Sequence, residues 1–398
     1  MAERQTEKKK AKNSATLGDI FRSLRELVSV SWKSHQKKRR RAQKKKLEER
    51  RLKPQLTKKQ LLRRRKKRNR VIRRVCLCVV TALALIVGAL AAVLGTVFYG
   101  PSRTASDQLV NSLLETSALK FVPRLYFSKE QVKEIVARNA VIVPEEKTDT
   151  SLVVVSAKSD DPGQDPEEIR DIELVEVKGP TYKGYMLIVR DPSRVKVGVC
   201  HNPFKERYGK FLDEIAEEEN AVAAINAGGF EDDNGSVKGG IPIGVVYKDG
   251  VQLWSETDTY YDTLIGFNYD DKLIIATGLS GHQSRELNLR DGVTFGPALV
   301  VNGEAAVIKG SSSGLNPRTA IGQRADGAVL MLVIDGRQPN SLGASLSDLI
   351  SIMLEYGAVN AANLDGGSSS KLYYQGKFIN DGVAVTGSRR LATAFIVK

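Results

Sequence analysis

The feature that most constrains this chain is a run of twenty-five residues without a charged side chain, Val75–Tyr99. Val, Leu, Ala, Ile and Gly make up most of it, and it is long enough for a bilayer core of about 30 Å. We therefore expect a transmembrane helix over residues 75–99. An uncleaved anchor is favoured over a signal peptide, because the run exceeds the roughly 7–15 apolar residues of a signal peptide and the charged segment before it is too long.

Charge divides the chain at the same place. Residues 1–74 hold 30 Lys and Arg against 6 Asp and Glu, a net of +24 within a formal total of +15, which leaves −9 for residues 75–398. Basic residues directly before the span predict a cytoplasmic tail over 1–74 and an extracellular C-terminal part.

Three partners were considered for this basic tail. Contact with the anionic inner leaflet is favoured, since each Lys or Arg near that surface contributes about 1 kcal/mol. Nucleic acid is the less favoured partner of these phosphate-binding side chains, and a cytoplasmic protein stays open. One face of a short amphipathic helix that could lie on the membrane is formed by Leu17, Ile20, Phe21, Leu24 and Val28.

Beyond the span, the pattern predicts three further parts. A helical stalk is expected over 100–146, with helices at Ser106–Ser117 and Ser128–Asn139, and a linker rich in Asp, Ser, Pro and Gly is expected over 147–170. Residues 171–398 then combine short strand-like runs with few helices, such as Phe211–Glu219, which predicts a mixed-sheet α+β catalytic domain. The expected strands include Ile172–Val177, Tyr185–Val189, Val195–Val199, Val222–Asn226, Ile243–Tyr247, Thr263–Asn268, Lys272–Thr277 and Ala298–Val301.

A strand–helix–strand unit is expected to carry the functional site. Ala328–Ile334 is apolar on both alternating faces, as in a strand covered on both sides, and ends in Asp335. A helix with a capping box follows from Ser345, and a second strand runs into Asp365. Such a unit would bring both acidic ends to one edge of a parallel pair, where ligands of these sheets bind.

Cysteine and histidine usage points away from metal chemistry. Cys76 and Cys78 lie at the start of the span, so Cys200 is alone in the exported part and has no disulfide partner there. A buried thiol at Cys200 is favoured over a nucleophile. No zinc-type cluster occurs, and the acidic run 231–235 is favoured as an exposed turn over a Ca²⁺ site. We predict neither a metal nor a cofactor.

The polar clusters after the strands suit a sugar phosphate. Arg318, Arg337 and Arg389 could grip a phosphate. An ion pair is the ordinary alternative for Arg318 and Arg337, and a solvated face is favoured for at least one of Arg389 and Arg390. The predicted catalytic pair is Asp335 and Asp365: one carboxyl protonates the leaving oxygen while the other acts as nucleophile or as base for water, with the assignment open. A glycine-rich loop after Asp365 could cradle the phosphate with its backbone and hydroxyl groups, through Gly366, Gly367, Ser368 and Ser369.

Six motifs in order resemble the phosphodiester glycosidase family over roughly residues 180–398. They are Asn226–Phe230, Gly240–Gly244, Gly296–Val300, Arg318–Gly322, Asp335–Arg337 and Leu364–Ser370. The resemblance implies cleavage between a sugar's anomeric carbon and a phosphodiester. It also implies site roles for Asn226, Arg318, Asp335, Arg337, Asp365 and the serines after Gly367. The chain departs from the family pattern at Gly229 and Ser368, which bears on pocket shape and hence on the substrate.

These observations predict a membrane-anchored extracytoplasmic hydrolase of sugar-1-phosphodiester linkages in envelope or extracellular glycans such as exopolysaccharide. One alternative is a non-catalytic glycan-phosphate binding module in envelope assembly. A third hypothesis makes the basic tail primary, with the protein as a scaffold anchor.

Overall fold

The computed structural model describes residues 38–39, 43–44, 57–116, 119–143, 146–155, 171–231, 238–255, 260–310, 314–380 and 389–398. The chain divides into two compact units, residues 1–89 and 90–398. The predicted amphipathic helix at 17–28 and the acidic turn at 232–235 lie outside the described residues.

The predicted membrane span lies within one 41-residue helix, α3 (Lys58–Phe98). This helix begins well before the apolar run because its basic flank is rich in Lys and Arg, which are good helix formers. Its apolar part is long enough to cross a membrane, by length and composition. The predicted orientation of the helix stays a prediction.

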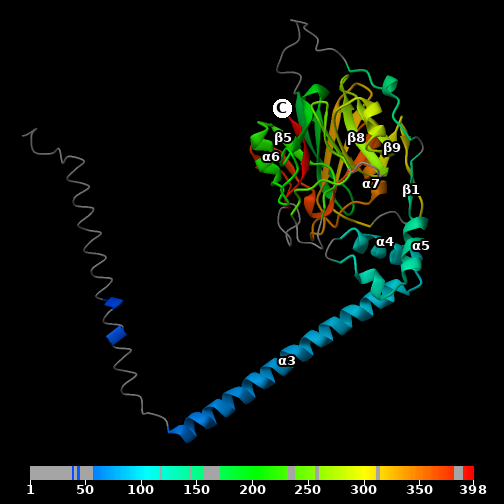
Figure 1. The fold of residues 1–398 in the computed structure, drawn as a ribbon. Helices are drawn as coiled ribbons and strands as arrows, with labels where there is room; N and C mark the ends of the chain where they lie inside the picture. Colours follow the sequence, from blue (N-terminus) through cyan, green and yellow to red (C-terminus); the bar gives the residue numbers. More distant parts are fainter. Residues whose placement is uncertain are drawn as a thin grey trace, which may run out of the picture. The chain divides into compact units, whose positions relative to one another are not determined.

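Two short helices follow α3, in the order in which the stalk pattern predicts them (Figure 1). In α4 (Arg103–Leu114) the Ser102 side chain caps the first turn, and in α5 (Lys129–Arg138) Ser128 and Gln131 form a capping box. Phe98, Val110 and Ile135 form their small core. The 3₁₀ helix between them is η1 (Val122–Leu125).

The predicted stalk and linker differ from the structure, because both lie against the sheets. β1 (Val141–Ile142) pairs with β13 (Val307–Ile308) in antiparallel register. Within the predicted linker, the Thr148 N–H donates to Ile275 O at 3.1 Å and the Val154 N–H donates to Ala325 O at 2.8 Å. Val153 is buried, so the apolar patch of this stretch is a docking segment. The remainder of the linker, 156–170, lies outside the described residues.

The largest sheet has seven strands in the order β12-β11-β16-β14-β15-β3-β2. Every strand pairing among the described residues is antiparallel. The fold class α+β is confirmed. The strands are β2 (Ile172–Lys178), β3 (Lys183–Val189), β11 (Ala298–Val301), β12 (Glu304–Ala305), β14 (Arg318–Arg324), β15 (Val329–Ile334) and β16 (Ala358–Leu364).

The prediction of an adjacent parallel pair is wrong, because β15 and β16 are not neighbours in the sheet. β14 lies between β15 and β16 and pairs with both in antiparallel register. The two outer strands therefore run in the same direction without touching, and their acidic ends still reach one edge.

Two five-stranded sheets complete the domain, and α6 (Leu212–Glu218) packs on the face of the one that contains β5 (Figure 1). The first has the order β7-β6-β10-β8-β9 and the second β18-β17-β5-β19-β4. Their strands are β4 (Val195–Val199), β5 (Ala223–Asn226), β6 (Val245–Lys248), β7 (Val251–Ser255), β8 (Tyr260–Asn268), β9 (Leu273–Ser280), β10 (Leu289–Phe295), β17 (Leu372–Tyr374), β18 (Lys377–Phe378) and β19 (Thr393–Val397).

β15 is buried on both faces, as its composition predicts. Met331 and Val333 belong to the core shared with β5 and β19, while Leu330 and Leu332 face a second core that contains Leu349 of α7 (Leu346–Glu355). The expected capping box at the start of α7 forms, with Ser345 and Asp348 as partners. The strand that precedes the site is therefore held rigidly.

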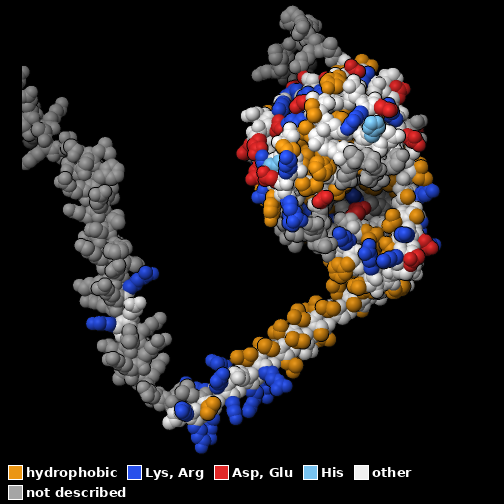
Figure 2. All heavy atoms as spheres, in the orientation of Figure 1, with side chains coloured by type: hydrophobic (Ala, Val, Ile, Leu, Met, Phe, Trp, Pro, Cys, Tyr) orange, Lys and Arg blue, Asp and Glu red, His pale blue; other side chains and the backbone are white. Residues whose placement is uncertain are grey.

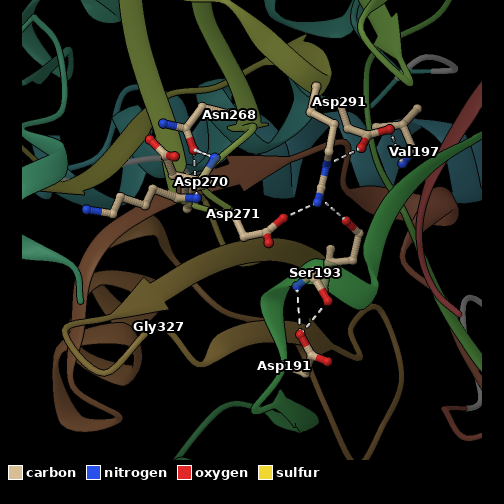
Figure 3. A network of polar contacts seen from close by, with 12 residues as sticks. Asp191, Ser193, Val197, Asn268, Asp270, Asp271, Asp291 and Gly327 are labelled. Atoms are coloured by element: carbon tan, nitrogen blue, oxygen red, sulfur yellow. Dashed lines mark hydrogen bonds and ion pairs between the residues drawn. The ribbon is translucent and has the colours of Figure 1, made fainter. Parts of the chain in front are cut away.

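A buried charge network joins the sheets away from the edge that carries Asp335 and Asp365 (Figure 3). Arg290 binds Asp271 and Asp291 and donates to Val195 O, and Asp291 in turn accepts from the Val197 N–H at 3.1 Å. Because the fully buried Asp291 carboxylate is paired, its desolvation is offset. We interpret this network as structural.

Candidate active site

One edge of the seven-stranded sheet collects the predicted site residues. Arg318 pairs with Ile334, the residue before Asp335, and Thr319 pairs with Leu364, the residue before Asp365. Neighbouring strands lie about 4.8 Å apart, so the backbones that lead to the two aspartates are about 10 Å apart. The structure therefore brings the two aspartates to one edge of the sheet, on either side of the strand that begins with Arg318.

Asp335 is almost fully buried and is held by its neighbours. Asn380 Nδ2 donates to Asp335 Oδ1 at 2.9 Å and to Ser370 O at 3.0 Å, while the Asp335 main chain binds Ser341 Oγ and Lys183 O. These contacts fix both the backbone and the carboxyl group, which pre-organises the site.

Asp365 is positioned through its backbone. Its N–H donates to Ala227 O at 3.0 Å, and its carbonyl oxygen accepts from Asn226 Nδ2. The Asn226 Oδ1 accepts from Thr319 Oγ1 and from the Lys371 N–H. The side chain of Asn226 therefore ties the end of β5 to β14 and to the segment after β16, and its predicted role in substrate binding stays a prediction.

Arg337 adopts the left-handed conformation, with φ +57°, which is uncommon for a residue other than glycine. Burial lowers the pKa of its guanidinium, and the nearby Arg318 and Arg389 act in the same direction while Glu115 opposes them. Three guanidinium groups therefore converge on one region. Glu115 is the acidic group that acts on Arg337, and the predicted role of the three arginines in phosphate binding stays a prediction.

The glycine-rich loop lies directly on these arginines. A Cβ atom added at Gly367, where φ is +62°, would lie 3.5 Å from Arg337 Nη1, and one added at Gly366 would lie 3.0 Å from Pro317 O. The Gly367 N–H donates to Pro317 O at 2.9 Å, and the N–H groups of Ser369 and Ser370 bond within the loop. These three N–H groups are therefore committed to the fold.

Arg318 reaches across the site toward α4. Its Nε donates to Ala344 O at 3.2 Å and its Nη2 to Gly314 O at 3.0 Å, and Nη2 also lies 3.0 Å from Glu115 Oε2. The end of helix α4 thus contacts the predicted phosphate-binding residues. In Figure 2 the surface is hollowed between the α4–α5 pair and the sheets, and acidic side chains are visible there.

The neighbouring arginines Arg389 and Arg390 contact different aromatic rings. Arg389 lies over the ring of Phe230 at 4.9 Å, beside Gly229, and its charge acts on Arg337. Arg390 lies over the ring of Phe211 and donates to Gly209 O. Arg389 is therefore the member of the pair that belongs to the site.

Two hydroxyl groups of the loop are buried without a hydrogen-bond partner among the described residues. They are the Oγ atoms of Ser369 and Ser370. Buried hydroxyls normally find partners, and both serines are almost fully buried, so the predicted contact of Ser369 with a phosphate stays a prediction. Ser368 is half-buried at the surface of the same turn.

Residues 219–398 match the sequence model of the phosphodiester glycosidase family. The match covers just under half of the chain and ends at its last residue. The resemblance carried by the six motifs is confirmed.

A curated relative matches the phosphodiester glycosidase domain. It is the SPbeta prophage-derived uncharacterized protein YomE of Bacillus subtilis (strain 168), 34% identical over 175 residues. The match covers 42% of this chain and 26% of that protein, so the chain spans about a quarter of the relative's length.

Two solved structures resemble the chain more distantly. The catalytic domain of zebrafish N-acetylglucosamine-1-phosphodiester alpha-N-acetylglucosaminidase, auto-inhibited by its pro-peptide, is 19% identical with a TM-score of 0.49, over 57% of this chain and 81% of that one. A hypothetical protein from Synechocystis is 18% identical with a TM-score of 0.41, over 57% and 61%.

Sequence reasoning missed three side chains of the phosphodiester glycosidase site. Asn380 precedes an Asp-Gly pair that reads as a turn, Asn316 precedes a proline, and Glu115 ends a predicted stalk helix. Nothing local marks these residues as partners of Asp335 or Arg318. Their signal is long-range pairing, which one sequence does not reveal.

Cys200 is a buried thiol and is remote from this chemistry. Burial raises its pKa to about 11, which favours the unreactive thiol form. Among the described residues no group of three or more His, Cys, Asp or Glu side chains is placed to hold a metal ion.

Proposed function

We propose that the protein is a membrane-anchored extracytoplasmic hydrolase that cleaves sugar-1-phosphodiester linkages in envelope or extracellular glycans. The observation that carries this proposal is the meeting of Arg318 and Arg337 with the Gly366–Gly367 turn between two aspartates at one sheet edge. Guanidinium groups suit a phosphodiester, and paired carboxylates suit glycosyl transfer.

In the proposed reaction the bond between the anomeric carbon and the phosphodiester oxygen breaks, and its electron pair stays on the phosphate. Arg318 and Arg337 stabilise that charge, so the leaving group needs little protonation. One of Asp335 and Asp365 either removes a proton from water or attacks the anomeric carbon before water does. The products are the free sugar and a phosphomonoester.

Hydrolysis of a panel of sugar-1-phosphodiesters, including UDP-N-acetylglucosamine, by the full chain in detergent tests the proposal. Sugar release is followed by NMR, which also identifies the anomer formed first. We expect Asp335→Asn and Asp365→Asn each to lower kcat by about 10²- to 10⁴-fold, the usual contribution of a positioned acid or base.

Asp326→Asn is the matched control, because Asp326 lies at the opposite end of β15 with a side chain that is 50% exposed. It should leave kcat unchanged. Binding of the panel without any release of sugar would instead favour a glycan-phosphate binding module.

A further inference from the structure

The end of α4 brings a carboxylate onto the anion-binding side chains. Glu115 Oε2 accepts a hydrogen bond from Asn316 Nδ2 at 2.6 Å and lies 3.0 Å from Arg318 Nη2. The next residue, Thr116, accepts through Oγ1 from Arg337 Nη2 at 3.2 Å, and Asn316 Oδ1 accepts from the same Nη2 at 2.9 Å. One oxygen of Glu115 is thus bound as a phosphate oxygen would be.

Local helix physics does not account for an acid at this position. Glu115 is the C-cap of α4, where the helix dipole disfavours negative charge. Its carboxylate is stabilised instead by contacts from residues two hundred positions away in the sequence. The position is therefore explained by the arginines of the glycosidase site rather than by the helix.

We propose that Glu115 occupies the phosphate subsite as an internal anion, so that α4 and the phosphate of a substrate compete for one set of donors. The shared donors are the side chains of Arg318 and Asn316, and Arg337 lies beside them through its bonds to Thr116 and Asn316. The inference deepens the proposed function, on which it rests for the identity of the competing anion. It adds Asn316 to the phosphate-binding residues and makes the membrane-proximal helix a regulator of the site.

Competition follows from charge and geometry. A carboxylate and a phosphodiester each carry one negative charge and both accept from guanidinium and amide donors. Two such groups cannot share one Arg318 Nη2 and one Asn316 Nδ2 without strong repulsion. Substrate binding therefore requires Glu115 to withdraw.

α4 packs so closely against Gly314 that one added methyl group at this glycine would disturb the contact. A Cβ added at Gly314 would meet Ser112 Oγ at 1.4 Å and the main-chain Gln108 O at 2.9 Å. Gly314→Ala therefore forces α4 and this loop apart while Glu115 remains in the chain.

Binding of inorganic phosphate to the full chain in detergent, measured by isothermal titration calorimetry, tests the competition without any turnover. Glu115→Gln should tighten phosphate binding about tenfold or more, since a charge-assisted contact is removed from the competing side. Gly314→Ala should tighten it in the same direction. Asn316→Ala should weaken it at least tenfold by removing a donor.

Glu130→Gln is the matched control, because Glu130 is an exposed acid in the first turn of α5. It removes the same charge from the same helical pair and should leave phosphate affinity unchanged. An unchanged or weaker phosphate affinity in both Glu115→Gln and Gly314→Ala would overturn the proposal. An unchanged phosphate affinity in Asn316→Ala would overturn it as well.

The two proposals fail separately. If Glu115→Gln tightens phosphate binding but no sugar-1-phosphodiester is cleaved, the competition stands and the hydrolase does not. If sugar is released and Glu115→Gln has the phosphate affinity of the wild type, the hydrolase stands and the competition does not.

Discussion

At the scale of single residues, the candidate site depends on side chains that hydrogen-bond both to a site residue and to the main chain of neighbouring strands and loops. Asn380 illustrates this. Its amide nitrogen holds the Asp335 carboxyl group and Ser370 O, while its Oδ1 accepts from the Leu372 N–H at 2.8 Å. Catalytic geometry and local stability are therefore linked through one buried amide.

We expect Asn380→Ala to lower the free energy of unfolding by about 1–3 kcal/mol, the usual cost of leaving buried polar groups unsatisfied. Sugar release should fall as well, because Asp335 loses its positioning contact. Chemical denaturation followed by circular dichroism measures the first effect. Lys377→Ala, an exposed change in the neighbouring β18, should do neither.

The Cys200 thiol makes stability depend on pH in the alkaline range. Burial raises its pKa from an ordinary 9.0 to about 11, so its contribution is fully present below pH 9 and is lost as the pH rises through 11. Denaturation of the wild type and Cys200→Ala at pH 8, 9.5 and 11 should show a difference in pH slope confined to the upper two values. Parallel slopes would show that the thiol titrates normally.

At the scale of elements, α7 clamps the sheet from the side opposite the main core. Leu349 is fully buried in the cluster that also contains Leu330 and Leu332 of β15. The helix therefore backs the strand that presents Asp335.

We expect Leu349→Ala to lower the free energy of unfolding by about 2–5 kcal/mol through lost burial and a cavity. Leu354→Ala in the same helix is the control, since Leu354 is 40% exposed, and should change stability little. Equal effects of the two substitutions in urea denaturation would contradict the packing described here.

Local patterns predicted the elements better than their pairing. The two-faced apolar composition of β15 and the capping box of α7 are visible in the sequence, and both form. The position of β14 between β15 and β16 is not visible in the sequence. The composition of β14 does not indicate which strands it pairs with: Arg-Thr-Ala-Ile-Gly-Gln-Arg. For the same reason the residues that end strands were found, whereas Asn380 and Glu115, which arrive from elsewhere, were missed.

At the scale of the whole molecule, the charge asymmetry of the chain predicts its orientation in a membrane. The basic tail precedes an apolar helix that is long enough to span, and basic segments stay on the cytoplasmic side. The glycosidase domain would then lie outside the cell.

A cysteine-labelling experiment tests this orientation in cells that express the full chain without its native cysteines. Glu130→Cys, in exposed α5, should react with a membrane-impermeant maleimide in intact cells. Gln43→Cys, in the tail, should react only after permeabilisation. The reverse pattern would invert the topology.

The order in which the chain meets its own domain has a mechanical consequence. In chain order, the segment after α3 contacts Arg318 through Glu115 before β1 pairs with β13 and before the chain reaches the sheets. Tension on this segment would therefore load the Glu115 contact before the strand pairing. Such tension would favour the withdrawal of Glu115 that phosphate binding requires, so that force on the chain would set how readily the site opens.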